Sequence, residues 1–173
     1  MNDFTSNVDF YIDNYNLEKQ IFKLGDDISK RGWTNKDEFL AICLWKSRRP
    51  KKLYQLNSAE FIKEQTKLTF SEKDEILKIK HLTKLQGVRI PTASAILSVH
   101  NPGDYPIIDE RCIQSLKTMK LIDWENISDK HWLEYLSIVQ DLAKKHNKTA
   151  REIEKGLFAY NRIKLDKEYR NLY

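Results

Sequence analysis

Apolar residues recur at helical spacing through most of the chain. Within 17–30, four of them are separated by four, three and four residues, which predicts an amphipathic helix: Leu17, Ile21, Leu24 and Ile28. Every position from 39 to 45 is apolar, so this segment is predicted to be the central buried helix. Residues 1–15 mix polar residues with scattered aromatics and are expected to form an irregular arm over the core.

Helix caps divide the rest of the chain. A Ser, Thr or Asn followed three residues later by a carboxylate is typical of a first helical turn, and four such pairs are predicted to start helices: Thr34 with Asp37, Asn57 with Glu60, Ser71 with Asp74, and Thr149 with Glu152. Further apolar periods predict helices in 106–119, 128–146 and 149–167, and no segment favours a strand. The pattern predicts a mainly α protein with one domain over 1–173, in which Trp124 and Trp132 belong to the core.

Composition and charge add limits to this picture. Only 5 of the 173 residues are Gly and 4 are Pro, as expected for a helix-rich protein. The net charge of +5 moderately favours a polyanionic partner. Cys43 and Cys112 lie in apolar helical patterns and are predicted to be buried free thiols, and no Cys/His group has metal-ligand spacing. No secretion signal and no membrane span is expected, so the predicted location is cytoplasmic, or nucleoid-associated in a bacterium.

The densest basic cluster covers residues 46–52, where five of seven residues are Lys or Arg. It lies beside Trp45 and Tyr54. Cations next to an aromatic side chain could contact phosphates while the ring stacks on a base. The same residues could equally form a solvated helix end whose cations complement the helix dipole.

A second group of candidate functional residues lies in 82–116, a segment that is predicted to form three helices joined by a tight turn and a loop. Gly87 stands where a helix end needs left-handed backbone, and Pro91 suits a helix start. Backbone N–H groups in the turn and around Thr92, together with the charge of Arg89, could bind a phosphate. An ordinary corner between two helices with an exposed Arg fits the same residues.

Asp109 lies near the start of the predicted helix 106–119. A carboxylate at a helix N-terminus is most simply a cap. The apolar segment 106–108 should hold this side chain firmly, however, and a fixed carboxylate could face a developing cation or orient a water molecule.

Taken together, the turn and the aspartate resemble the helix-hairpin-helix (HhH-GPD) superfamily of DNA glycosylases. Residues 85–89 (LQGVR) resemble the hairpin of that family, and Thr92 and Ala93 follow at the matching place. Asp109 comes 22 residues after Gly87, the spacing expected for the catalytic aspartate of the family. The resemblance implies a mainly α, two-lobed helical bundle with a helix-hairpin-helix motif at 74–100 and the aspartate helix at 106–119.

The chain also departs from the family pattern. The second glycine of the hairpin is replaced by Arg89. Pro91 occupies the position where bifunctional members carry a Schiff-base lysine, so the resemblance implies a monofunctional enzyme. The four-cysteine motif of iron–sulfur members is absent from the sequence, so neither an iron–sulfur cluster nor another cofactor is expected, although the hairpin could hold a monovalent cation.

The resemblance implies a monomer that acts on double-stranded DNA and extrudes one nucleotide into a pocket. In this hypothesis Asp109 stabilises the sugar cation and orients water, and the damaged or modified base leaves by hydrolysis. The remaining roles fall on eight residues: Gly87, Arg89, Thr92, Lys46, Arg48 and Arg49 for DNA binding, and Trp45 and His100 for the base pocket.

Two other hypotheses fit the sequence. The chain could be a non-catalytic helix-hairpin-helix DNA-binding module in which Asp109 is only a cap, or a helical protein-interaction domain. The target base, and the choice between repair and defence against modified foreign DNA, stay open at this stage.

Overall fold

The computed structural model describes residues 3–15 and 20–165, and this part of the chain contains helices and no strand, which confirms the mainly α prediction. The elements in order are α1 (Asp3–Ser6), α2 (Val8–Asp13), the 3-10 helix η1 (Gln20–Leu24), α3 (Gly25–Arg31), α4 (Lys36–Lys46), α5 (Lys51–Gln55), α6 (Ala59–Ser71), α7 (Glu75–Thr83), α8 (Ile90–His100), α9 (Glu110–Thr118), α10 (Asp129–His146), α11 (Ala150–Tyr160) and the π-helix η2 (Asn161–Leu165).

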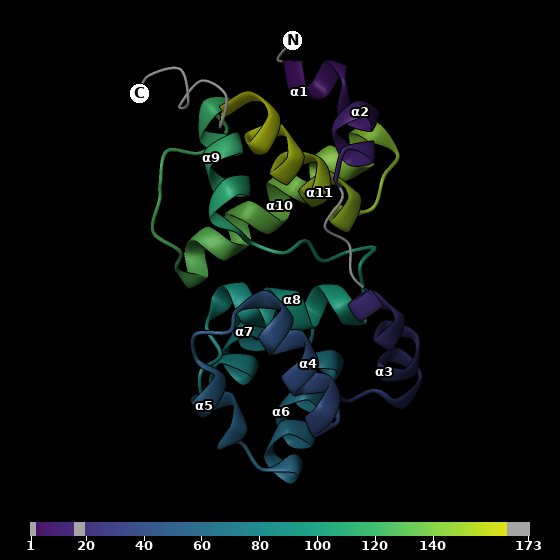
Figure 1. The fold of residues 1–173 in the computed structure, drawn as a ribbon, viewed down its shortest axis with the longest axis vertical. Coiled ribbons are helices and arrows are strands. Elements are labelled where there is room, and N and C mark those ends of the chain that lie inside the picture. The colour runs from purple at the N-terminus through teal and green to yellow at the C-terminus, as the bar shows by residue number, and fades with distance from the viewer. Residues whose placement is uncertain (1–2, 16–19, 166–173) are drawn as a thin grey trace.

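The helices gather in two groups (Figure 1). Helices α3 to α8 form one group, while α1, α2, α9, α10 and α11 form the other. Helix α10 contacts α7 and so joins the two groups. The segment that leads from α8 to α9 passes between them in Figure 1. Residues at the end of this segment therefore lie where the two groups meet.

Helix α8 is the central helix of its group. Every residue from Thr92 to Val99 is buried, and α3, α4 and α7 all pack against this helix. The prediction that 39–45 is the central buried helix is therefore wrong: in α4, Ala41 is exposed and Trp45 is only partly buried. The small side chains of α8 let neighbouring helices approach on all sides, whereas the larger side chains of α4 leave one face near solvent.

The N-terminal residues form two short helices rather than the expected irregular arm. Phe4 and Tyr11 are buried and pack with Tyr160 of α11, with ring centroids 5.1 to 5.9 Å apart. Helix α2 lies against α11, so the two ends of the described chain form one core. Leu17, placed in the first predicted helix, lies outside the described residues.

The predicted caps are confirmed in part. Thr149 and Glu152 form the predicted capping box of α11. The box of α4 uses Asn35 and Glu38, one residue later than predicted, because the backbone N–H of Thr34 donates to Thr66 in the core.

Two other caps differ from the prediction. Helix α6 is capped by Ser58, since Asn57 binds the backbone of another segment. Helix α7 is capped by Asp74 itself, because α6 continues through Ser71. Side-chain partners from distant segments thus decide which of two adjacent polar residues becomes the cap.

The core predictions for the tryptophans and cysteines are confirmed. Trp132 and Trp124 are buried, and Cys43 and Cys112 are buried free thiols. Among the described helices, none combines the length and apolar character needed to cross a bilayer.

Candidate functional site

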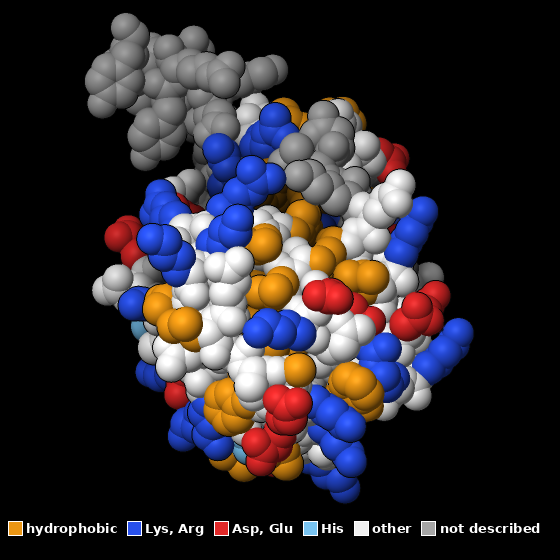
Figure 2. Space-filling model, turned by 60° about the horizontal axis from the view of Figure 1, so that its bottom comes forward, with side chains coloured by type: hydrophobic (Ala, Val, Ile, Leu, Met, Phe, Trp, Pro, Cys, Tyr) orange, Lys and Arg blue, Asp and Glu red, His pale blue; other side chains and the backbone are white. Residues whose placement is uncertain are grey.

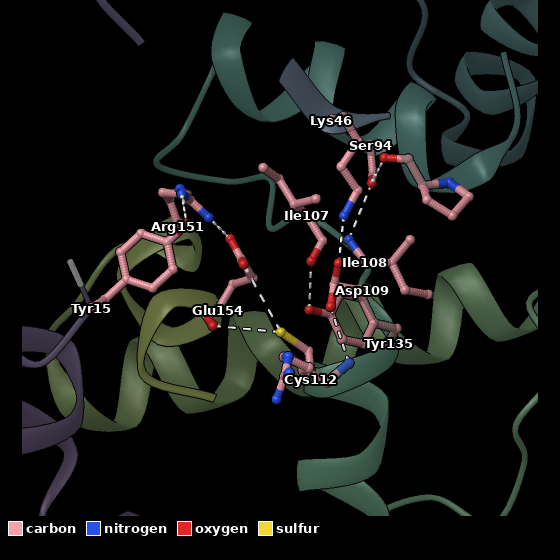
Figure 3. Close-up of polar contacts among 12 residues, drawn as sticks. Tyr15, Lys46, Ser94, Ile107, Ile108, Asp109, Cys112, Tyr135, Arg151 and Glu154 are labelled. Carbon is pink, nitrogen blue, oxygen red and sulfur yellow. Dashed lines mark hydrogen bonds and ion pairs between the residues drawn. The ribbon is translucent and has the colours of Figure 1, made fainter. Parts of the chain in front are cut away.

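Asp109 ends an extended segment that is fixed from both sides. Its backbone neighbours Ile107 and Ile108 are buried; the N–H of Ile108 donates to Ser94 Oγ on α8 at 3.1 Å, and Tyr135 on α10 donates to the carbonyl of Ile107 at 2.9 Å (Figure 3). The predicted helix over 106–119 is thus shorter at its start: α9 begins only after Asp109, because the preceding residues are extended and bonded to other helices.

Two hydrogen-bond donors contact the Asp109 carboxylate. One oxygen accepts from the backbone N–H of Arg111 at 3.0 Å, which makes Asp109 the N-cap of α9, and the other lies 2.7 Å from Lys46 Nζ (Figure 3). Burial by itself would raise the pKa of Asp109, but the Lys46 ammonium and the Arg111 N–H outweigh it and lower the pKa below its usual value. The side chain is 27% exposed, so the ionised carboxylate is held firmly yet reached by solvent.

A buried polar cluster lies behind Asp109. Arg151 and Glu154 form an ion pair on α11, and both side chains are almost fully buried. The Cys112 sulfur lies 3.6 Å from the Glu154 carbonyl oxygen (Figure 3). Burial, together with the charge of Asp109, raises the pKa of the Cys112 thiol to about 12. This thiol is therefore protonated at neutral pH and is not a nucleophile.

The turn between α7 and α8 is anchored on the preceding helices. The Asn57 side chain accepts from the N–H of Gln86 at 2.8 Å and donates to its carbonyl at 3.1 Å. Gly87 has φ +82°, and a Cβ atom there would lie 2.9 Å from the Tyr54 ring. Only glycine fits this left-handed position against α5. The turn is therefore a fixed feature and not a flexible loop.

The turn leaves backbone donors free. Within the described chain, the N–H groups of Gly87, Arg89 and Ile90 donate to no acceptor, while Arg89 itself is exposed. The N–H of Thr92 instead donates to the Arg89 carbonyl at 2.9 Å, and its hydroxyl lies 3.4 Å from the Tyr54 hydroxyl. The N–H and the hydroxyl of Thr92 are thus used in internal contacts. The groups of the turn that could bind an anion are therefore the N–H groups of Gly87, Arg89 and Ile90.

The basic cluster of 46–52 leads into α5, and Leu53 and Tyr54 of α5 lie against Gly87 in the turn. Arg48 and Arg49 are exposed between α4 and α5. Figure 2 shows Lys and Arg side chains around much of the edge of the face at the α5 and α6 end, with apolar side chains and carboxylates between them. Basic, acidic and apolar side chains therefore share this face of the molecule.

Trp45 is partly buried, and its ring meets the ring of Phe22 edge to face at 5.8 Å. A hollow of about 460 Å³ opens beside it, lined also by Ile21, Leu44, Arg48 and Lys51. Trp45 directly precedes Lys46, whose Nζ contacts the Asp109 carboxylate, but neither Lys46 nor Asp109 lines the hollow beside Trp45.

His100 is not brought into this arrangement. It lies at the opposite end of α8 from the turn, where its ring stacks on Phe70 at 3.8 Å and its Nδ1 lies 3.3 Å from Ser29 Oγ. Burial, with a smaller contribution from the Lys78 charge, lowers its pKa. The contacts of His100 are those of a neutral packing residue, and they give its predicted base-pocket role no support.

A larger groove of about 940 Å³ separates the turn from α9. Its lining includes Arg89 and Pro91 from the turn, Glu110 and Gln114 from α9, and apolar residues such as Ile113. Within the described residues no group of three or more His, Cys, Asp or Glu could hold a metal ion. The groove therefore brings charged, polar and apolar side chains together beside the turn.

Sequence reasoning missed the partners of the aspartate. The ion pair of Lys46 with Asp109 joins residues 63 positions apart, and the pair of Arg151 with Glu154 was not singled out. The spacing of three residues within an amphipathic helix could have suggested the second pair, whereas no local signal marks the first.

Comparisons with protein-family models, curated proteins and solved structures found no match to this chain.

Proposed function

We propose that this protein is a DNA glycosylase of the helix-hairpin-helix type, which extrudes a damaged or modified base from double-stranded DNA and hydrolyses its bond to the sugar. The observation that carries the proposal is the Asp109 carboxylate, held ionised where the two helix groups meet. It follows, at the family spacing, a turn whose N–H groups are free to bind phosphate.

In this proposal the turn and the basic cluster hold the DNA backbone. The free N–H groups of Gly87, Arg89 and Ile90 would bind one phosphate, and the Arg89 side chain adds a full charge. Arg48 and Arg49 would contact neighbouring phosphates, since both are exposed and precede α5, the helix that lies against the turn. Such contacts position the duplex without reading its sequence.

Asp109 would supply the chemistry. As the bond between C1′ and the base nitrogen stretches, positive charge develops on the sugar, and an ionised carboxylate stabilises that charge. The same carboxylate orients a water molecule, whose oxygen bonds to C1′ while the base leaves with the bonding electrons and takes up a proton. Trp45 would stack on the extruded base, because this partly buried ring borders a hollow that Arg48 and Lys51 of the basic cluster also line.

A second candidate function is a DNA-binding module of the same type without catalysis. It is favoured by one specific observation: the Asp109 carboxylate already has two structural partners, the Arg111 N–H and Lys46. In this alternative Asp109 caps α9 and anchors α4 to it, and DNA binding alone is the activity.

One experiment separates these functions. Duplexes that carry damaged or naturally hypermodified bases are incubated with the protein and then treated with alkali, which cleaves DNA at abasic sites. Asp109→Asn should abolish cleavage and retain DNA binding, since Asn caps a helix as well as Asp does. The matched control is Asp74→Asn, which changes another helix cap in the same way and should leave cleavage unchanged.

The salt dependence of binding tests the shared part of both candidates. Affinity for duplex DNA should fall steeply with salt if phosphate contacts dominate. Binding without cleavage on any substrate would favour the non-catalytic module. No DNA binding at low salt would contradict both candidates and favour a protein-interaction domain.

A further inference from the structure

We infer that the hydroxyls of Ser94 and Tyr135 are positioning groups for base excision, because together they hold the Asp109 carboxylate at a fixed place relative to the turn. The inference rests on the proposed function, in which the turn binds the DNA backbone and Asp109 faces the sugar. Both side chains are fully buried, so they act on the substrate only through the extended segment that ends at Asp109.

The Ser94 hydroxyl joins the start of α8 to this segment. It donates to the carbonyl of Pro91 at 2.9 Å, in the first turn of α8. It also accepts from the N–H of Ile108 at 3.1 Å (Figure 3). Pro91 directly follows the N–H groups that would bind phosphate, and Ile108 directly precedes Asp109. One oxygen atom therefore links the proposed phosphate site to the proposed catalytic carboxylate.

Tyr135 holds the same segment from the other helix group. Its hydroxyl donates to the carbonyl of Ile107 at 2.9 Å (Figure 3). The consecutive residues Ile107 and Ile108 are thus bonded to α10 of one group and α8 of the other (Figure 1). Burial raises the pKa of the Tyr135 hydroxyl well above its usual value, and the charge of Asp109 adds to this effect. The hydroxyl therefore stays protonated at neutral pH and remains a donor.

The two bonds control the backbone that carries the carboxylate. Ile107 and Ile108 are buried, so their polar backbone groups need partners other than bulk water. Loss of either hydroxyl leaves one of these groups unsatisfied, which favours a shift of the segment towards another partner. Asp109 would move with the segment. A displacement of about 1 Å at a reacting group can lower a rate by roughly 100-fold.

The chain offers a matched control for each substitution. Ser98 lies one turn later on α8, is equally buried, and its hydroxyl has no hydrogen-bond partner within the described residues. Tyr11 on α2 is a second buried tyrosine, and its hydroxyl donates to Asp3. Ser98→Ala and Tyr11→Phe therefore remove a buried hydroxyl of the same kind without changing the segment before Asp109.

The test compares rate with affinity on the duplex, among those with damaged or naturally hypermodified bases, that the wild type cleaves best. Base release is measured under single-turnover conditions, and the affinity for the same duplex is measured in parallel. Circular dichroism at the assay temperature shows that each variant is folded. Each of the two variants tests the inference separately.

Ser94→Ala and Tyr135→Phe should each lower the rate about tenfold or more, because both displace the carboxylate. The affinity should stay within about twofold of wild type, since the turn and the basic cluster are unchanged. The double variant should lose much less than the product of the two single losses, because either change alone already frees the segment. Ser98→Ala and Tyr11→Phe should match the wild type in rate and affinity.

Wild-type rates in the folded variants would overturn the inference and leave the proposed function standing. A loss of affinity as large as the loss of rate, or an equal loss of rate in the controls, would also overturn it, since the hydroxyls would then support binding or folding in general. Failure of the wild type to release a base from every duplex would instead refute the proposed function, and the inference with it.

Discussion

Replacing Lys46 by Met gives a sharp prediction about stability. Met has a similar length and keeps the apolar stem of the side chain, so the change removes mainly the charge. Asp109 would then keep its N-cap bond to Arg111 but lose the ammonium 2.7 Å away. A largely buried carboxylate would be left without its compensating cation.

The magnitude follows from the geometry. Two unit charges about 3 to 4 Å apart attract by roughly 4 to 6 kcal/mol at an effective dielectric constant of 20. Part of this attraction is offset because Lys46 no longer has to be desolvated, and solvent reaches the 27% of Asp109 that is exposed. The free energy of unfolding should therefore fall by about 2 to 3 kcal/mol at pH 7.

The loss should depend on pH. In the wild type the lowered pKa of Asp109 contributes stability above the unfolded pKa, and this contribution disappears as the pH falls through the folded pKa. In Lys46→Met burial would prevail and raise the pKa of Asp109, so the carboxylate would become protonated at higher pH than in the unfolded chain. The difference between the two proteins should be largest at pH 7 and shrink towards about pH 4.

Urea unfolding at the two pH values measures both effects. The double variant Lys46→Met with Asp109→Asn is the control, because it removes both charges and keeps the cap. It should be more stable at pH 7 than Lys46→Met alone. A loss below about 0.5 kcal/mol, or a loss of equal size at both pH values, would refute the argument that the pair contributes through its charges.

Two further predictions concern the fold around the site. Gly87→Ala should lower the free energy of unfolding by about 2 kcal/mol or more, because it strains a positive φ and crowds the Tyr54 ring. Gly32→Ala should lower it by only about 1 kcal/mol, since the φ of Gly32 is also positive but no atom lies near its Cβ position. Equal losses for the two variants in urea unfolding would contradict this. Glu154→Gln should cost about 3 kcal/mol because it removes the carboxylate from the buried charge of Arg151, and a thermal midpoint within 2 °C of wild type would contradict this.

The sequence predicted some local features of this fold, although the caps of α4, α6 and α7 differ from the prediction. The box of Thr149 and Glu152 and the helix predicted over 128–146 depend on neighbouring residues, and both are confirmed. The burial of Trp132 follows from its place on an apolar face. Such features need only the helical period and the chemistry of a helix end, which neighbouring residues determine.

Features set by distant contacts were harder to predict. The burial of α8 depends on three helices packing around small side chains, so its short run of Ala and Ser residues looked less apolar than 39–45. The N-terminal segment that was expected to be irregular forms α1 and α2, because Phe4 and Tyr11 pack against Tyr160 of α11.

The candidate site divides in the same way. The sequence indicated Asp109 and the turn at Gly87, whereas the contact with Lys46 and the separation of His100 from the site depend on how helices cross. Side chains 63 residues apart carry no spacing signal that would link them.

The most direct test of the central claim is the rate of base release under single-turnover conditions on the best substrate of the damaged and hypermodified panel. The account predicts that Asp109→Asn lowers this rate by roughly 10² to 10⁴-fold, while the affinity for the same duplex changes little and Asp74→Asn matches the wild type. Base release by Asp109→Asn at the wild-type rate would contradict the assignment of Asp109 as the catalytic carboxylate.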